Sequence, residues 1–162
     1  MAQFDYSQPG AYFVTVCTEN KKCILSTIVG GDAHIAPYVS LTSTGRVVEK
    51  YLRTIPGIDC YVIMPNHVHM ILRISAKNEQ GGPVWDDAPT EAKIPKLIQS
   101  WKILVSKSLG FSIWQRSYYD RIIRDEREYI TIAQYILDNP AKWCDDDYYQ
   151  KEETIYPNCQ KT

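Results

Sequence analysis

The stretch that most constrains how this chain can fold is residues 61–72, which carry two of its three histidines. The stretch is rich in Val, Ile and Leu, a composition that favours a β-strand over a loop. Successive side chains on a strand point to opposite faces, so His67 and His69 are expected on the same face of a sheet. Two adjacent imidazoles are costly to bury without partners, and they form a natural half of a metal site.

The 162 residues predict a single domain, 1–162, long enough to bury a hydrophobic core. No apolar run is long enough to span a bilayer, and the first residues lack a signal-peptide pattern, so no membrane association is expected. The cysteines number five and form no CxxC pair. This favours reduced thiols, and hence a cytoplasmic protein, over a disulfide framework or a zinc finger.

Hydrophobic periodicity predicts strands interleaved with helices. Strands are expected at 10–18, more weakly at 34–41, over the histidine run at 58–74, and briefly within 112–124. Helices are expected at 42–54, 93–108 and 125–138. Because a proline cannot donate to a strand ladder, Pro65–Asn66 predicts a bulge or kink just before His67. The segment 76–92 is expected to be a mobile loop, and 145–162 an acidic tail. The pattern favours an α+β sandwich with one sheet packed against two or three helices.

Two polar residues near the end of the third helix extend the histidine hypothesis. Tyr135 and Asn139 are four residues apart, so they project from the same side of that helix. If this side faces the histidines, two imidazoles and a carboxamide oxygen can hold a divalent metal, and the phenol can attack phosphorus. Each residue also has an ordinary explanation, because Tyr135 is one of twelve tyrosines and Asn139 precedes a proline at a helix end.

The charge is unevenly distributed, although the net charge is only -1. Residues 93–127 contain eight basic and three acidic side chains, whereas acids collect in 79–91 and 145–153. A locally basic surface on a near-neutral protein is compatible with binding a polyanion, but many exposed surfaces have this character.

Four sequence blocks, in order, resemble the HUH single-tyrosine transposases, in particular those of the REP-associated, IS200-like type. The resemblance covers about residues 5–143 and is carried by DYSQPGAYFVTVCT, VIMPNHVH, IWQRSYYDRIIRDE and YILDNP. The resemblance implies a ferredoxin-like fold whose antiparallel sheet carries the histidines on a central strand. It also implies that His67, His69 and Asn139 ligate Mg²⁺ or Mn²⁺ and that Tyr135 is the nucleophile.

The implied activity is cutting and rejoining single-stranded DNA, often beside a hairpin, through a 5′-phosphotyrosine intermediate. Bases stack on aromatic side chains and phosphates pair with cations. The expected DNA contacts are therefore Trp114, Gln115, Arg116, Tyr118, Tyr119, Arg121 and Arg124. Lys102 and Lys107 are also expected to contact DNA, although each of these two lysines is equally typical of a residue that only keeps the surface soluble. Such an enzyme belongs in the bacterial cytoplasm, associated with the nucleoid, and the family contains both monomers and homodimers.

Two alternatives stay open at this point. A domesticated relative would bind single-stranded DNA without catalysis, and a metal-dependent hydrolase would use water instead of a tyrosine. Two features also depart from the family pattern: few basic residues precede the first block, and the acidic segments make this chain less basic than a DNA enzyme usually is.

Overall fold

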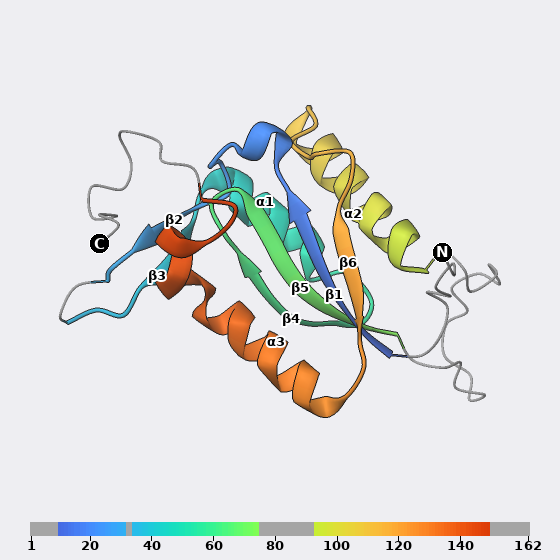
Figure 1. Cartoon of the computed structure of the whole chain (residues 1–162). Coiled ribbons are helices and arrows are strands. Elements are labelled where there is room, and N and C mark those ends of the chain that lie inside the picture. The colour runs from blue at the N-terminus through green and yellow to red at the C-terminus, as the bar shows by residue number, and fades with distance from the viewer. Residues whose placement is uncertain (1–9, 32–33, 75–92, 150–162) are drawn as a thin grey trace.

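A four-stranded antiparallel sheet forms the centre of the protein, whose computed structural model describes residues 10–31, 34–74 and 93–149. Its strands lie in the order β4 (Ile58–Ile63), β5 (His67–Ile74), β1 (Gly10–Cys17) and β6 (Tyr119–Ile123). Helices α1 (Ser43–Leu52) and α2 (Lys93–Leu109) pack on one face, and α3 (Glu126–Asp138) lies on the other (Figure 1). This confirms the predicted α+β, ferredoxin-like fold with the histidines on a central strand.

Alternation along the two central strands divides the interior into two cores. Tyr12, Val14 and Val16 of β1 pack toward α1 and α2 in the larger core. Phe13 points to the opposite face, where it packs in a smaller core with residues of α3 such as Ile136. The smaller core anchors α3 against the face that carries both histidines.

The predicted strand over 58–74 is wrong as a single element, because the chain reverses within it. β4 and β5 pair antiparallel as a hairpin, with Ile63 opposite Val68 and Pro65–Asn66 in the connection. The Met64 N–H donates to the His67 carbonyl at 2.8 Å and closes the turn. A proline presets the backbone for the second position of a turn, so it ends the strand instead of kinking it. The observed register shift lies elsewhere, between Ile58 and Cys60.

A second sheet of two strands lies beside the first (Figure 1). The predicted strand at 34–41 is realised as β3 (Tyr38–Leu41), which pairs with β2 (Ser26–Val29), a strand the sequence did not predict. Short 3₁₀ turns, η1 (Glu19–Lys21) and η3 (Asn139–Asp145), follow β1 and α3.

Helix α3 begins with a capping residue, Asp125, at the position where the predicted helix starts. The Asp125 carboxylate accepts the Glu128 N–H at 2.8 Å. The Glu128 carboxylate accepts the N–H of Arg124, one residue before the capping residue, at 2.8 Å. This reciprocal pair satisfies two otherwise unpaired donors and fixes where the helix starts.

The predicted loop 76–92 and the tail beyond 149 lie outside the described residues. Within the described ranges, no helix has the length and apolar character needed to cross a membrane. Cys17, Cys23 and Cys60 form no disulfide, as predicted. Cys144 is disulfide-bonded, so the expectation of reduced thiols throughout is wrong at that position.

Candidate active site at the histidine pair

The two histidines of β5 point to the α3 face of the sheet and lie almost completely inside the protein. The ladder places His67 opposite Cys17 and His69 opposite Thr15 on the neighbouring strand β1. The exposed fraction is 0% for His67 and 2% for His69. Their Nε2 atoms are only 3.0 Å apart. The strand spacing of two therefore converges both rings on one point.

Asn66 sets the orientation of the His67 ring. Its Nδ2 donates to the carbonyl oxygens of Lys21 at 3.1 Å and Tyr148 at 2.8 Å. Since its amide nitrogen faces two acceptors, its Oδ1 faces His67 Nδ1, at 2.9 Å, and accepts a hydrogen bond from it. The proton of the neutral imidazole is therefore on Nδ1, and Nε2 is an acceptor, with His69 Nε2 3.0 Å away.

Thr15 and Phe13 orient the His69 ring. The Thr15 hydroxyl lies 2.8 Å from His69 Nδ1, and because a hydroxyl can donate or accept, it suits either tautomer. The Phe13 ring stacks on the imidazole with centroids 5.3 Å apart. Both contacts leave Nε2 directed at His67.

Tyr135 and Asn139 reach the same place from α3. The Tyr135 hydroxyl lies 3.3 Å from His69 Nε2, and this tyrosine is 40% exposed. Asn139 follows one turn later and is 1% exposed. Its Oδ1 is buried and has no hydrogen-bond partner among the described residues. The four residues predicted from the sequence, His67, His69, Tyr135 and Asn139, thus gather within one chain.

Asp146 joins this group, and the sequence analysis missed it. One of its carboxylate oxygens and one nitrogen of each histidine all lie within 4.8 Å of one another. Asp146 follows η3. Pro140 stands in the first turn of η3, and a proline does not fit inside an α-helix, so α3 ends just before it. The available signal was an acid seven residues after Asn139, but it stands in a run of three aspartates that is equally typical of a solvated tail.

Burial controls the protonation of the site. It lowers the pKa of His67 well below its ordinary value and that of His69 to about 3, so both rings are neutral at pH 7. Burial also raises the pKa of the Tyr135 phenol, and the negative charge of Asp146 adds to the effect. Burial likewise raises the pKa of the Asp146 carboxyl, partly opposed by hydrogen bonds that include one to Asn139.

Some of the predicted DNA contacts on and near α2, such as Lys102 and Trp114, already make contacts within the protein. The Lys102 ammonium donates to backbone carbonyls of residues 115–117, at 2.9 Å for the first, and burial lowers its pKa. It also lies 5.6 Å from the ring centroid of the half-buried Tyr118. Trp114 is 6% exposed and packs against Trp101. The remaining members of this group are Lys107, Gln115 and Arg116.

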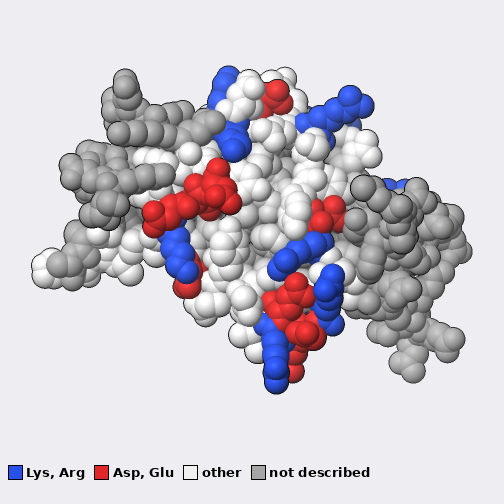
Figure 2. All heavy atoms as spheres, viewed as in Figure 1, with Lys and Arg blue, Asp and Glu red and all other residues white. Residues whose placement is uncertain are grey.

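The other predicted DNA contacts lie along the edge strand β6. Tyr119 is 52% exposed, and its ring meets Phe13 edge-on. Arg121 forms an ion pair with Glu128 at 3.2 Å, whereas Arg124 is exposed. Among the described residues, Figure 2 shows basic and acidic side chains interleaved in this view.

Comparisons with known proteins place the chain among relatives. No protein-family model matches it. An uncharacterised protein of Haemophilus influenzae is 32% identical over 168 residues, spanning 92% of this chain and 90% of the relative. A second protein of the same organism, described as "Putative REP-associated tyrosine transposase", is 20% identical over 85% of this chain and 74% of its own length.

A solved structure has the same fold. It is a REP-associated tyrosine transposase bound to a REP hairpin, with a TM-score of 0.55 and 19% identity over 88% of this chain and 74% of that one. At this identity the likeness concerns the fold alone. The shared fold, the approach of Tyr135 to the central histidine pair, and the sequence similarity to a protein described as a REP-associated tyrosine transposase are consistent with the resemblance to HUH single-tyrosine transposases of the REP-associated type.

Proposed function

We propose that this protein is a transposase-type enzyme that cleaves and rejoins single-stranded, hairpin-bearing DNA with Tyr135 as nucleophile and a divalent metal at the histidine pair. The observation that carries the proposal is the 3.3 Å separation between the Tyr135 hydroxyl and His69 Nε2, beside a pair of Nε2 atoms only 3.0 Å apart. The packing of α3 on this face of the sheet brings the nucleophile and the metal-binding pair, which lie on separate elements, to the same point.

The residues present fit a divalent ion. The two imidazole Nε2 atoms lie 3.0 Å apart, so both rings could direct a nitrogen ligand at the same ion. The Oδ1 of Asn139, buried and without a hydrogen-bond partner among the described residues, could serve as an oxygen ligand, and the Asp146 carboxylate would supply a charge that Mg²⁺ and Mn²⁺ favour. We therefore propose that His67, His69 and Asn139 hold the ion and that Asp146 contributes to the same site.

The metal, when bound, would polarise the scissile phosphate and stabilise its developing negative charge. Tyr135 forms a bond from its phenol oxygen to phosphorus, while the bond from phosphorus to the 3′ oxygen breaks. The phenol loses a proton and the departing oxygen gains one, leaving a 5′-phosphotyrosine and a free 3′-hydroxyl. The ester conserves the energy of the broken bond, so the reverse reaction rejoins a strand without an external energy source.

Tyr135 needs activation in this reaction, because its surroundings raise the pKa of the phenol above its ordinary value of 10.0. A phenol of this kind is protonated at neutral pH and is a weak nucleophile. A nearby positive charge favours the phenolate, so a cation at the histidine pair opposes the effects of burial and of Asp146. The tyrosine is therefore expected to react only with metal present.

Support for a DNA partner comes from the relative solved with a REP hairpin and from the basic residues of 93–127. Because the described chain brings tyrosine and histidines together by itself, the proposed reaction requires no tyrosine from a second subunit. If the protein forms a homodimer, each subunit would then carry a complete site of its own. A DNA enzyme of this kind would work in the cytoplasm, at the nucleoid.

The proposal is tested with a hairpin-bearing single-stranded oligonucleotide and Mn²⁺. We expect a covalent protein–DNA adduct that survives denaturation, requires the metal and disappears in Tyr135→Phe. Tyr38→Phe, which changes an exposed tyrosine on β3, is the matched control and should retain the adduct. An adduct that persists in Tyr135→Phe would show that another tyrosine is the nucleophile.

A second candidate is a domesticated protein that binds single-stranded DNA without cleaving it. The burial of His67 and His69 favours this alternative, because a phosphate must reach atoms that are 0% and 2% exposed. DNA binding that is unchanged by a chelator, with no adduct under any metal condition, would identify it.

A further inference from the structure

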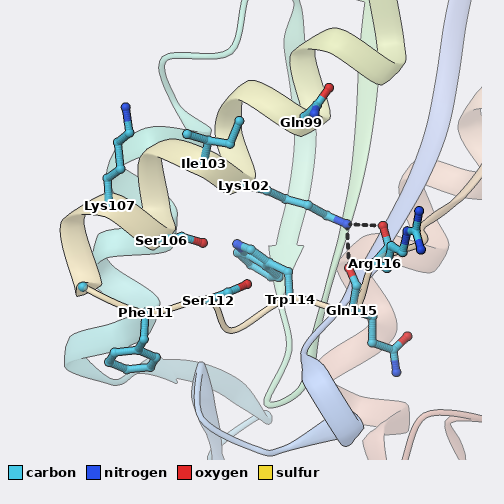
Figure 3. Close-up of a pocket in the computed structure, with 11 residues that line it drawn as sticks. Gln99, Lys102, Ile103, Ser106, Lys107, Phe111, Ser112, Trp114, Gln115 and Arg116 are labelled. Carbon is cyan, nitrogen blue, oxygen red and sulfur yellow. Dashed lines mark hydrogen bonds between the residues drawn. The ribbon is translucent and has the colours of Figure 1, made fainter.

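A hollow of about 540 Å³ lies between α2 and the segment 110–116, on the side of the sheet away from the histidines (Figure 3). This volume falls within the range of small-ligand sites, ~300–1,000 Å³. The side chains that matter here are Lys102, Lys107, Phe111, Trp114 and Arg116. The reaction proposed at the histidine pair uses none of them.

The hollow has the charge expected of an anion site. Three cations line it and no acidic residue does. The Lys102 ammonium donates to backbone carbonyls. Lys107 and Arg116 are exposed, and neither forms an ion pair with another described residue. Two cations at the rim of a hollow that also presents aromatic side chains suit a phosphate attached to a flat ring.

Two aromatic side chains, Phe111 and Trp114, line the hollow. Trp114 is 6% exposed, and its buried Nε1–H has no hydrogen-bond partner among the described residues. In Figure 3 the indole nitrogen lies on the side of the hollow where Ser106 and Ser112 stand. Phe111 is 61% exposed at the same hollow, so an unused aromatic surface lies beside an unused donor.

The hollow is connected to the candidate active site through the backbone. The Gln115 N–H donates to the Cys17 carbonyl at 3.0 Å, and Cys17 stands opposite His67 in the sheet. Residues 114–115 and the histidine strand thus flank the same end of β1. Their backbones are two ladder spacings of ~4.8 Å apart, and because the hollow and the histidines lie on opposite faces, a DNA strand that occupies both must pass around the edge of the sheet.

We propose that this hollow receives one unpaired nucleotide of the DNA, with its base stacked on Phe111, an acceptor of the base facing Trp114 Nε1–H, and its phosphates beside Lys107 and Arg116. The inference rests on the proposed function, because it assigns a subsite for the same DNA. Every base has an aromatic face and an acceptor atom, so the subsite tolerates any sequence.

The test uses the full chain with a fluorescein-labelled oligo(dT) and its 5-iodouracil analogue. In anisotropy titrations we expect Phe111→Ala to weaken binding about tenfold through lost stacking. Lys107→Gln should reduce the slope of log affinity against log salt by about 0.7, the value for one phosphate on a single strand. Tyr38→Ala, which removes another exposed aromatic ring, is the matched control and should bind like the unchanged protein.

Photocrosslinking locates the base directly. The iodouracil analogue should crosslink to the peptide that contains Phe111 and Trp114. Trp114→Phe should weaken binding severalfold; because this side chain is buried, the circular dichroism spectrum at the assay temperature, and not the melting temperature, checks that the variant is folded. Phe111→Ala affinity within twofold of the unchanged protein, or crosslinks confined to other peptides, would overturn the subsite. If the Tyr135-dependent adduct still forms, the proposed function survives that result. If the unchanged protein binds no DNA, both proposals fall.

Discussion

Replacing Asn66 with alanine should damage both the stability of the fold and the affinity of the metal site. The side chain is completely buried and makes three hydrogen bonds: to the His67 ring and to the carbonyls of Lys21 and Tyr148. At about 1 kcal/mol net for each bond, the free energy of unfolding should fall by roughly 3 kcal/mol. Loss of the contact that orients a metal-binding histidine should weaken Mn²⁺ binding by about 10–100-fold.

Denaturant unfolding with and without excess Mn²⁺ separates these two effects. Bound metal raises the free energy of unfolding by an amount that grows with the logarithm of its affinity. The increase in the free energy of unfolding on adding Mn²⁺ should therefore be about 1.4–2.7 kcal/mol smaller in Asn66→Ala than in the unchanged protein. Ser26→Ala is the control, because it removes one buried hydrogen bond to the Ile63 carbonyl without touching a histidine. It should lose about 1 kcal/mol of stability and keep the full increment. An equal increment in Asn66→Ala would refute the role given to Asn66.

Two further variants test other parts of the account. Asp146→Asn should weaken Mn²⁺ binding measured by calorimetry by about tenfold or more, because it removes a charged oxygen from the group around the histidines; unchanged affinity would remove Asp146 from the site. Asp59→Asn should cost about 0.5 kcal/mol at pH 7, since the Tyr129 hydroxyl that ties α3 to β4 donates to this partly exposed carboxylate at 2.6 Å. That hydrogen bond lowers the pKa of Asp59 from 3.8, so the stabilisation is fully present above about pH 4 and is lost as the pH falls through the lower folded-state pKa. The unfolding curves of the two proteins should therefore converge in acid, and a gap that widens there would contradict this interpretation.

Strong periodicity made the helices and the first strand predictable, because their apolar faces repeat over many residues. The hairpin at Pro65–Asn66 was misread since both of its strands are apolar and no glycine marks the turn. Seventeen residues are too many for one ordinary strand, and that length was the signal for a reversal. Strand β2 has only four residues and is a strand because it pairs with β3. No local sequence pattern reveals that pairing.

The candidate site was predictable to the extent that its members share an element. His67 and His69 are two apart on a strand, and Tyr135 and Asn139 four apart on a helix, so each pair follows from local geometry. That the two pairs face each other depends on how α3 packs, and it was expected only from the family resemblance. Asp146 shows no periodicity with any of them, because a 3₁₀ turn separates it from α3.

Thr15 and Asn66 were missed for a similar reason. Each acts on a histidine from across a strand or a turn, through a hydrogen bond that pattern analysis does not show. Phe111 was missed because one exposed aromatic residue in a polar stretch has no periodic partner. All three residues become apparent only when the strand register and the turn geometry are known from the folded chain.

The central claim is that Tyr135, one of twelve tyrosines, attacks a phosphate held at the histidine pair. The most direct measurement is mass spectrometry of the protein–DNA adduct formed with Mn²⁺, after nuclease trimming and proteolysis. The account predicts a nucleotide esterified through its 5′-phosphate to Tyr135, formed only with metal. A nucleotide on another tyrosine, or cleaved DNA with no modified peptide, would contradict it.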